Sequence, residues 1–159
     1  MKSNFLLLGI SLSFIALLSA CGSANQIGAQ TQSDVTTASL TETYWKVTRI
    51  DGTAVEMAAD QAREKHFILK NTGTQVIGFS GCNRFFGQFT SKMKNSSEGS
   101  LRFENLGSTK MACPNVDFNE QQLLTVFSNT THYQITGESL SLLDKNSETL
   151  ATFESIYFQ

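Results

Sequence analysis

The chain lacks the patterns on which most enzymatic and metal-dependent sites are built. It has no C-x2-C or H-x3-H pair that would space ligands for zinc. It also has no glycine-rich phosphate loop, no G-x-S-x-G nucleophile elbow and no clear pair of carboxylates. A cysteine–histidine nucleophile using His66 or His132 is the remaining alternative, but no motif places either histidine near a cysteine. We therefore expect no enzyme, no metal and no cofactor.

Charge is also scarce, and its two signs are mixed. Charged residues make up 16% of the chain, with 12 Lys and Arg against 14 Asp and Glu. A nucleic-acid partner would usually require a basic stripe, and none is present. The longest apolar run, from Phe5 to Leu18, is about 14 residues, whereas a membrane-spanning helix needs roughly 20.

That apolar run instead has the layout of a secretory signal. Lys2 precedes it, and the small residues Ser19 and Ala20 follow it. The next residue is Cys21, so Leu18-Ser19-Ala20-Cys21 resembles the lipobox of bacterial lipoproteins. The resemblance implies that Cys21 becomes an acylated N-terminus, with acyl chains supplying membrane affinity. The alternative is an ordinary cleaved signal with an incidental cysteine.

The expected organisation is a signal peptide over 1–20, a tether over 21–40 and one domain over 41–159. Loss of 1–20 removes Lys2 and no acid, so the formal charge changes from −2 to −3. The tether is rich in small and polar residues, and about 19 flexible residues reach roughly 25 Å. Residue 22 is Gly, and an Asp there would suggest retention in the inner membrane. By the same resemblance we expect an outer-membrane anchor with the domain facing the periplasm.

Alternating apolar residues and frequent turn residues predict a mostly β domain. The expected strands are 44–50, 66–70, 75–80, 84–92, 99–105, 107–111, 131–136, 139–143 and 150–157. Residues 56–65 are expected to form a loop or one short turn. Only 116–129 has firm helical periodicity, with Pro114 ahead of it. We predict an α+β fold, a small antiparallel barrel-like or sandwich domain with one covering helix at about 116–129.

Aromatic and cysteine positions add two expectations. Most strand phenylalanines should be core, but adjacent Phe85 and Phe86 must point to opposite faces, leaving one to the surface or a cavity mouth. Two cysteines, Cys82 and Cys113, remain after lipidation. In an exported chain they predict a disulfide, which at 31 positions apart stabilises by about 3–4 kcal/mol in a chain-entropy model.

Several strings, in this order, resemble the META/HslJ family. They are Tyr44-Trp45, Asp51-Gly52, GFSGCNRFFG from Gly78 to Gly87, LGSTKMACP from Leu106 to Pro114, Glu120, Leu123-Leu124 and Gly137 to Leu140. The family often has Arg where this chain has Lys110, a mild departure. The resemblance covers about 41–156 and implies a small antiparallel, barrel-like α+β fold, often in envelope lipoproteins. It also implies links to heat shock, novobiocin resistance and, in eukaryotic relatives, motility and virulence, without an established catalytic activity.

The glycines, cysteines and proline of these strings favour a folding staple. The competing interpretation is a recognition patch formed by Asn83, Arg84, Thr109 and Lys110. As function we expect a stress or envelope-maintenance binding module, or an antibiotic-tolerance accessory, with an envelope protein or peptide as partner and no nucleic acid. The alternatives are a carrier or pilot that holds an acyl chain or peptide in a barrel cavity, and a lysozyme-inhibitor-like lipoprotein. A cavity lined by phenylalanine with few polar groups would favour the carrier, and a filled core with an exposed polar patch would favour the binding module.

Overall fold

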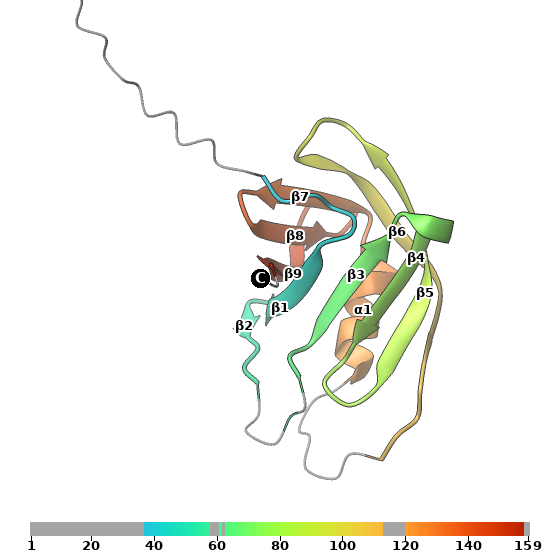
Figure 1. The fold of residues 1–159 in the computed structure, drawn as a ribbon. Helices are drawn as coiled ribbons and strands as arrows, with labels where there is room; N and C mark the ends of the chain where they lie inside the picture. The colour runs from blue at the N-terminus through green and yellow to red at the C-terminus, as the bar shows by residue number, and fades with distance from the viewer. Residues whose placement is uncertain (1–36, 58–60, 62, 113–119, 158–159) are drawn as a thin grey trace, which may run out of the picture. The chain divides into compact units, whose positions relative to one another are not determined.

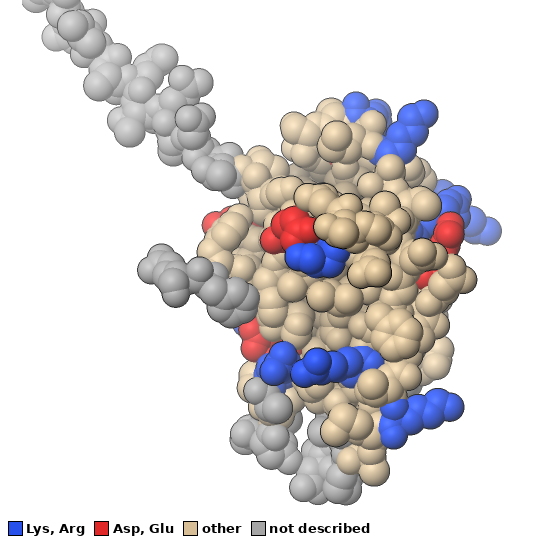
Figure 2. Space-filling view, turned by 45° about the vertical axis from the view of Figure 1, so that its right-hand side comes forward, with Lys and Arg blue, Asp and Glu red and all other residues tan. Residues whose placement is uncertain are grey.

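A closed ring of eight antiparallel strands forms the framework of the domain (Figure 1). The computed structural model describes residues 37–57, 61, 63–112 and 120–157. The chain divides into two units, 1–33 and 34–159, and every described residue belongs to the second. The outer face of the strands between residues 66 and 93 comes forward in Figure 2. No helix among the described residues is long and apolar enough to cross a bilayer.

The strands follow one another around the ring almost in chain order. They are β1 (Tyr44–Ile50), β2 (Thr53–Ala54), β3 (His66–Lys70), β4 (Gln75–Phe79), β5 (Arg84–Met93), β6 (Glu98–Ser108), β7 (His132–Thr136), β8 (Ser139–Leu143) and β9 (Thr149–Ile156). Each of β3 to β9 pairs with the next, and β1 closes the ring by pairing with both β3 and β9. The short β2 extends one side of β1. The closure confirms a barrel rather than a sandwich.

The first strand shows how the inward face is selected. Simple alternation predicts Trp45 and Val47 on one face and Ile50 on the other. The structure corrects this, because all three side chains are buried. A register shift between Val47 and Arg49 in the pairing with β9 adds one residue, which turns Ile50 back toward the core.

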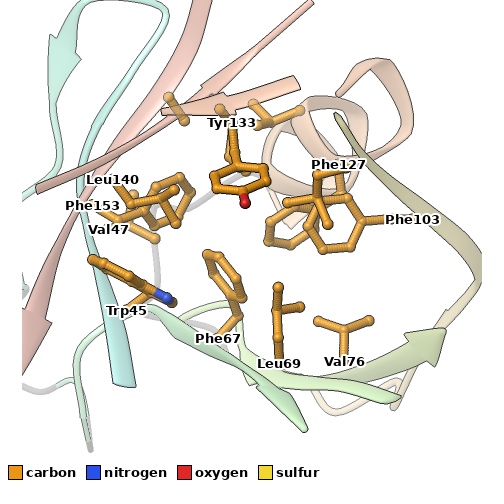
Figure 3. Packing of buried hydrophobic residues seen from close by; sticks show 14 of the residues in the cluster. Trp45, Val47, Phe67, Leu69, Val76, Phe103, Phe127, Tyr133, Leu140 and Phe153 are labelled. Atoms are coloured by element: carbon orange, nitrogen blue, oxygen red, sulfur yellow. The ribbon is translucent and has the colours of Figure 1, made fainter. Parts of the chain in front are cut away.

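The barrel interior is filled by side chains. Leu123, Val126 and Phe127 of the helix α1 (Glu120–Asn129) are buried in it. The Phe67 ring lies 5.4 Å from the Phe127 ring and 4.9 Å from the Phe153 ring, between centroids, in edge-to-face contacts (Figure 3). The helix thus supplies part of the core, while 116–119 of the predicted helix and Pro114 lie outside the described residues.

The pair β5–β6 differs from expectation. Two strands were expected at 99–105 and 107–111, but β6 is one strand that ends at Ser108. A bulge keeps it continuous: the register shifts between Phe86 and Gln88, and Asn105 has a φ of 54°. Gly87 permits the close approach, because a Cβ there would lie 2.9 Å from the Glu104 carbonyl oxygen.

The remaining turns and loops follow the sequence closely. Asp51-Gly52 turns the chain with φ of 46° and 75°. The turn after β3 contains a short 3-10 segment, η1 (Thr72–Thr74). The described residues of 56–65 contain neither helix nor strand, as expected, and β2 was not predicted.

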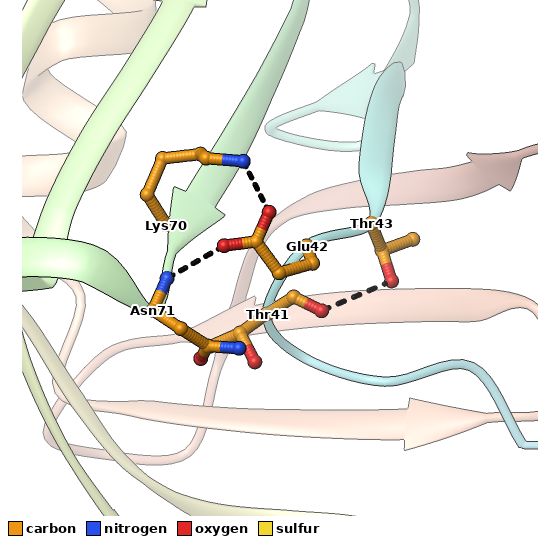
Figure 4. Close-up of polar contacts among 5 residues, drawn as sticks. All are labelled: Thr41, Glu42, Thr43, Lys70 and Asn71. Carbon is orange, nitrogen blue, oxygen red and sulfur yellow. Dashed lines mark hydrogen bonds and ion pairs between the residues drawn. The ribbon is translucent and has the colours of Figure 1, made fainter.

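The segment before β1 is fastened to the end of β3 (Figure 4). The Glu42 carboxylate pairs with the Lys70 ammonium and accepts a 2.7 Å hydrogen bond from the Asn71 N–H. These contacts, with Lys70 first, hold the pKa of Glu42 below its ordinary value. Ala38 and Leu40, in the segment expected to be tether, also pack against the core.

Candidate functional site

The corner between β4 and β5 is a tight turn over Ser80 to Asn83. The Ser80 N–H and hydroxyl both donate to the Asn83 carbonyl oxygen, at 2.8 and 3.0 Å. Gly81 has a φ of 106°, a conformation that other residues rarely adopt. A Cβ at Gly81 would also lie 2.7 Å from the Lys65 side chain. The backbone conformation therefore favours glycine here, and any larger residue would also have to displace the end of the Lys65 side chain.

Asn83 joins three separate segments. Its Oδ1 accepts hydrogen bonds from the Thr109 hydroxyl at 2.9 Å and from the Met111 N–H at 2.7 Å. Its Nδ2 donates to Glu120 Oε2 at 3.0 Å, at the first residue of α1. The side chain is buried, so these bonds replace water that it cannot reach.

The structure brings the four candidate patch residues together but gives them two different roles. Two hydrogen bonds join Arg84 and Thr109: the Thr109 N–H donates to the Arg84 carbonyl oxygen at 2.9 Å, and the Arg84 N–H donates to the Thr109 side-chain Oγ1 at 3.2 Å. The polar side-chain groups of Asn83 and Thr109 are hydrogen-bonded within this network. Arg84 and Lys110 are exposed. Thr109 is exposed as well, but its hydroxyl is already hydrogen-bonded to Asn83, so the charged part of the surface patch is its two cations.

Of the three cysteines in the predicted sites, only Cys82 is among the described residues. Cys82 Sγ lies 3.5 Å from the Met111 carbonyl oxygen, which places it beside the segment that leads to residue 113. Cys113 and Cys21 lie outside the described residues. The Cys82–Cys113 disulfide and the acylation of Cys21 stay predictions.

Glu120 is a member of this network that sequence analysis did not place there. One carboxylate oxygen accepts from Asn83, while the buried Oε1 has no hydrogen-bond partner in the part of the chain described. Its place at the start of α1 suits a negative charge beside the helix N-terminus. The signals in the sequence were its place in the family pattern and its place near the start of the predicted helix.

A second surface, which sequence analysis missed, lies on the outer face of β3, β4 and β5. Ile68, Ile77 and Phe86 are cross-strand neighbours in one row. A second row, displaced by two residues on each strand, consists of His66, Phe79 and Arg84. With Arg63 they line an open hollow of about 310 Å³, which we call the β3–β5 hollow. Phe85, by contrast, is buried, which confirms that the adjacent phenylalanines point to opposite faces.

The charged groups of this hollow are basic. The Arg63 guanidinium lies 5.8 Å from the centroid of the Phe79 ring. Arg63 and Arg84 form no salt bridge with any described residue. Figure 2 shows Lys and Arg side chains gathered low on this face beside uncharged surface.

One edge of the hollow is made by an aromatic stack. The His66 ring lies 4.0 Å from the Tyr44 ring, between centroids, and nearly parallel to it. Burial lowers the pKa of His66 and raises the pKa of Tyr44 to about 12, where the nearby Glu64 carboxylate adds to the effect. His66 is therefore neutral in the folded protein at neutral pH.

Other hollows lie elsewhere on the surface. The one around Met93, His132 and Tyr133 measures about 610 Å³ and is open to solvent. No group of three potential metal ligands occurs among the described residues. The barrel core is filled by side chains. A filled core is what we expected for a binding module, whereas a carrier would need a cavity.

Comparison with known proteins decides the family. The META domain model matches residues 38–156, about three quarters of the chain. The chain belongs to the META domain family. This META domain protein is similar to a protein from Burkholderia xenovorans solved by NMR, with 29% identity over 75% of this chain and 85% of that one and a TM-score of 0.56.

A second NMR structure of a protein has 23% identity over 72% of this chain and 90% of that one, with a TM-score of 0.51, and it supports the fold alone. No curated protein matched the META domain chain.

Proposed function

We propose that this META domain protein is a lipid-anchored, non-enzymatic binding module of the bacterial envelope. In this proposal acylated Cys21 holds the domain at the outer membrane on the periplasmic side, where it acts as a stress or antibiotic-tolerance accessory. Membership of the META family supports the general role, and the lipobox-like run before Cys21 supports the anchor.

The observation that carries the binding role is the division within the family motif. Asn83 and Thr109 hold the framework together, while Arg84 and Lys110 remain on the surface. A filled core leaves no described interior space for a ligand, so recognition falls to the outside of the barrel. The proposal assigns no residue to catalysis.

The test of the anchor is metabolic labelling with palmitate in intact cells. Wild-type protein should incorporate label, and Cys21→Ala should lose it completely because the acceptor thiol is gone. Cys82→Ser is the matched control, since it removes a cysteine but should keep the label. If the anchor is needed, Cys21→Ala at native expression should fail to complement a deletion strain under heat or novobiocin stress.

Label in the Cys21→Ala protein would refute the anchor. Full complementation by an unacylated periplasmic form would refute the requirement for a membrane-held domain.

A further inference from the structure

The β3–β5 hollow displays apolar side chains where a water-facing strand surface normally carries polar ones. Phe86 is 55% exposed and Ile77 is 41% exposed. Ile68 and Phe79 continue the same surface into the hollow. A contiguous apolar surface of this kind commonly marks an interaction site.

The Phe86 side chain is supported by its neighbour on β6. Phe86 pairs with Gly107, and a Cβ at Gly107 would lie 3.2 Å from the Phe86 ring. The ring therefore rests over a main chain that has no side chain of its own. This support holds an exposed aromatic ring in place on the surface.

The charges beside this surface are complementary to an anionic partner. Arg63 and Arg84 border the hollow, and no acidic side chain of the described residues lines it. Exposed Lys110 follows Thr109, which is hydrogen-bonded to Arg84. The nearby Glu64 acts on Tyr44. This local positive charge contrasts with a chain whose net charge is −2.

The pairing of the strands favours a lipid surface over a peptide. Each of β3, β4 and β5 is hydrogen-bonded to a strand on both sides, so this face offers no free edge to which a peptide could add as a strand. The hollow is open, and its exposed apolar groups stand outward beside the cationic side chains of Arg63 and Arg84. Apolar and aromatic groups flanked by Lys and Arg are the usual chemistry of attachment to anionic bilayers.

We propose that the β3–β5 hollow docks the domain on a bilayer that carries anionic headgroups. Phe86 and Ile77 enter the boundary between headgroups and acyl chains, and Arg63 and Arg84 pair with phosphates. The proposal deepens the proposed function, resting on the idea that the domain works beside a membrane. Docking would give the domain a fixed orientation on the membrane surface.

The experiment measures sedimentation of the domain with vesicles of equal parts phosphatidylcholine and phosphatidylglycerol, against vesicles of phosphatidylcholine alone. The form of the protein used in this experiment begins at residue 22, so it lacks Cys21 and carries no acyl group. It keeps the whole described core, which lies between Ala38 and Phe153. Wild type should bind the anionic vesicles, with binding reduced by salt. Phe86→Ser should weaken binding about tenfold, and Arg84→Gln about fivefold.

Met93→Ser is the matched control. Met93 is 73% exposed, lies on the same strand and is roughly 23 Å of extended chain from Phe86. It should bind like wild type, and all variants should keep the wild-type melting temperature.

Several results would overturn the proposal. One is a folded wild-type domain that does not bind anionic vesicles, and another is equal loss in Met93→Ser and Phe86→Ser. A photocrosslinker at position 86 that captures an envelope protein, with no vesicle binding, would assign the surface to a protein instead. None of these results bears on palmitate labelling of Cys21, so failure here is distinguishable from failure of the anchor.

Discussion

Asn83 shows how a motif residue can look like a recognition group and act as a framework group. Its amide makes three hydrogen bonds, to Thr109, Met111 and Glu120, which come from segments 26 to 37 residues further along the chain. The pattern GCNRFFG predicted the turn, because glycine and asparagine suit it. The partners of the amide could not be predicted, because they depend on where the chain returns after β6.

Replacing Asn83 with Ala should lower the free energy of unfolding by about 3 kcal/mol, since the buried Asn83 amide makes three hydrogen bonds to two other segments, 109–111 and the first residue of α1, and all three are lost. Chemical denaturation measures the change. Arg84→Ala is the adjacent control and should stay within about 0.5 kcal/mol of wild type because its side chain is exposed. Equal stability of the two variants would show that the network contributes little.

His66 gives the fold a dependence on pH. Its pKa in the folded protein is lowered by burial, with Tyr44 stacked on it and Arg63 and Glu64 nearby. The unfolded chain takes up the proton near pH 6.5. The neutral imidazole therefore contributes stability that is fully present above about pH 6.5 and is lost as pH falls through the lower folded pKa.

The melting temperature of wild type should fall between pH 7 and pH 5 more steeply than that of His66→Gln, which cannot take up the proton. Thermal unfolding across this range measures both slopes. His132→Gln alters an exposed histidine and should follow wild type. Parallel curves for wild type and His66→Gln would mean that His66 does not contribute to the acid sensitivity.

At the scale of elements, period-two patterning located most strands to within a residue. β1, β3 and β8 have the predicted bounds, because each is a short apolar alternation between clear turns. The errors occur at bulges. Ile50 was assigned to the wrong face, and β6 was divided in two near Asn105, since a bulge adds a residue without altering composition.

The helix was predicted as a cover, and the structure gives it a larger part. Phe127 lies 4.6 Å from the Phe103 ring and 5.2 Å from the Phe85 ring, between centroids, so α1 fills the space that the strands enclose. Its spacing of apolar residues indicated a buried side but not what that side would meet. The choice between a filled barrel and a carrier cavity depends on this contact.

At the scale of the whole molecule, sequence and structure contribute different halves of the functional hypothesis. The lipobox-like run consists of adjacent residues, so it can be recognised from the sequence alone. The β3–β5 hollow cannot be predicted from the sequence, because Ile68, Ile77 and Phe86 become neighbours only through the register of three strands. Each of them alone looks like an ordinary strand residue.

The predicted Cys82–Cys113 disulfide belongs to this scale, because it would tie the β4–β5 corner to the segment ahead of α1. Met111, two residues before Cys113, already has its carbonyl oxygen 3.5 Å from Cys82 Sγ. Cys82→Ser and Cys113→Ser should each lower the free energy of unfolding by about 3–4 kcal/mol, since each removes the same cross-link across 31 positions. The double variant should then cost little more than either single one.

Alkylation with and without reduction checks the bond directly, in protein taken from intact cells without added reductant. Both thiols should resist modification until a reductant is added, and reduced wild type should then unfold like the double variant. Ready alkylation of both cysteines before reduction would contradict the bond. In that case the corner would depend on the Asn83 network alone, and Asn83→Ala would be the more damaging change.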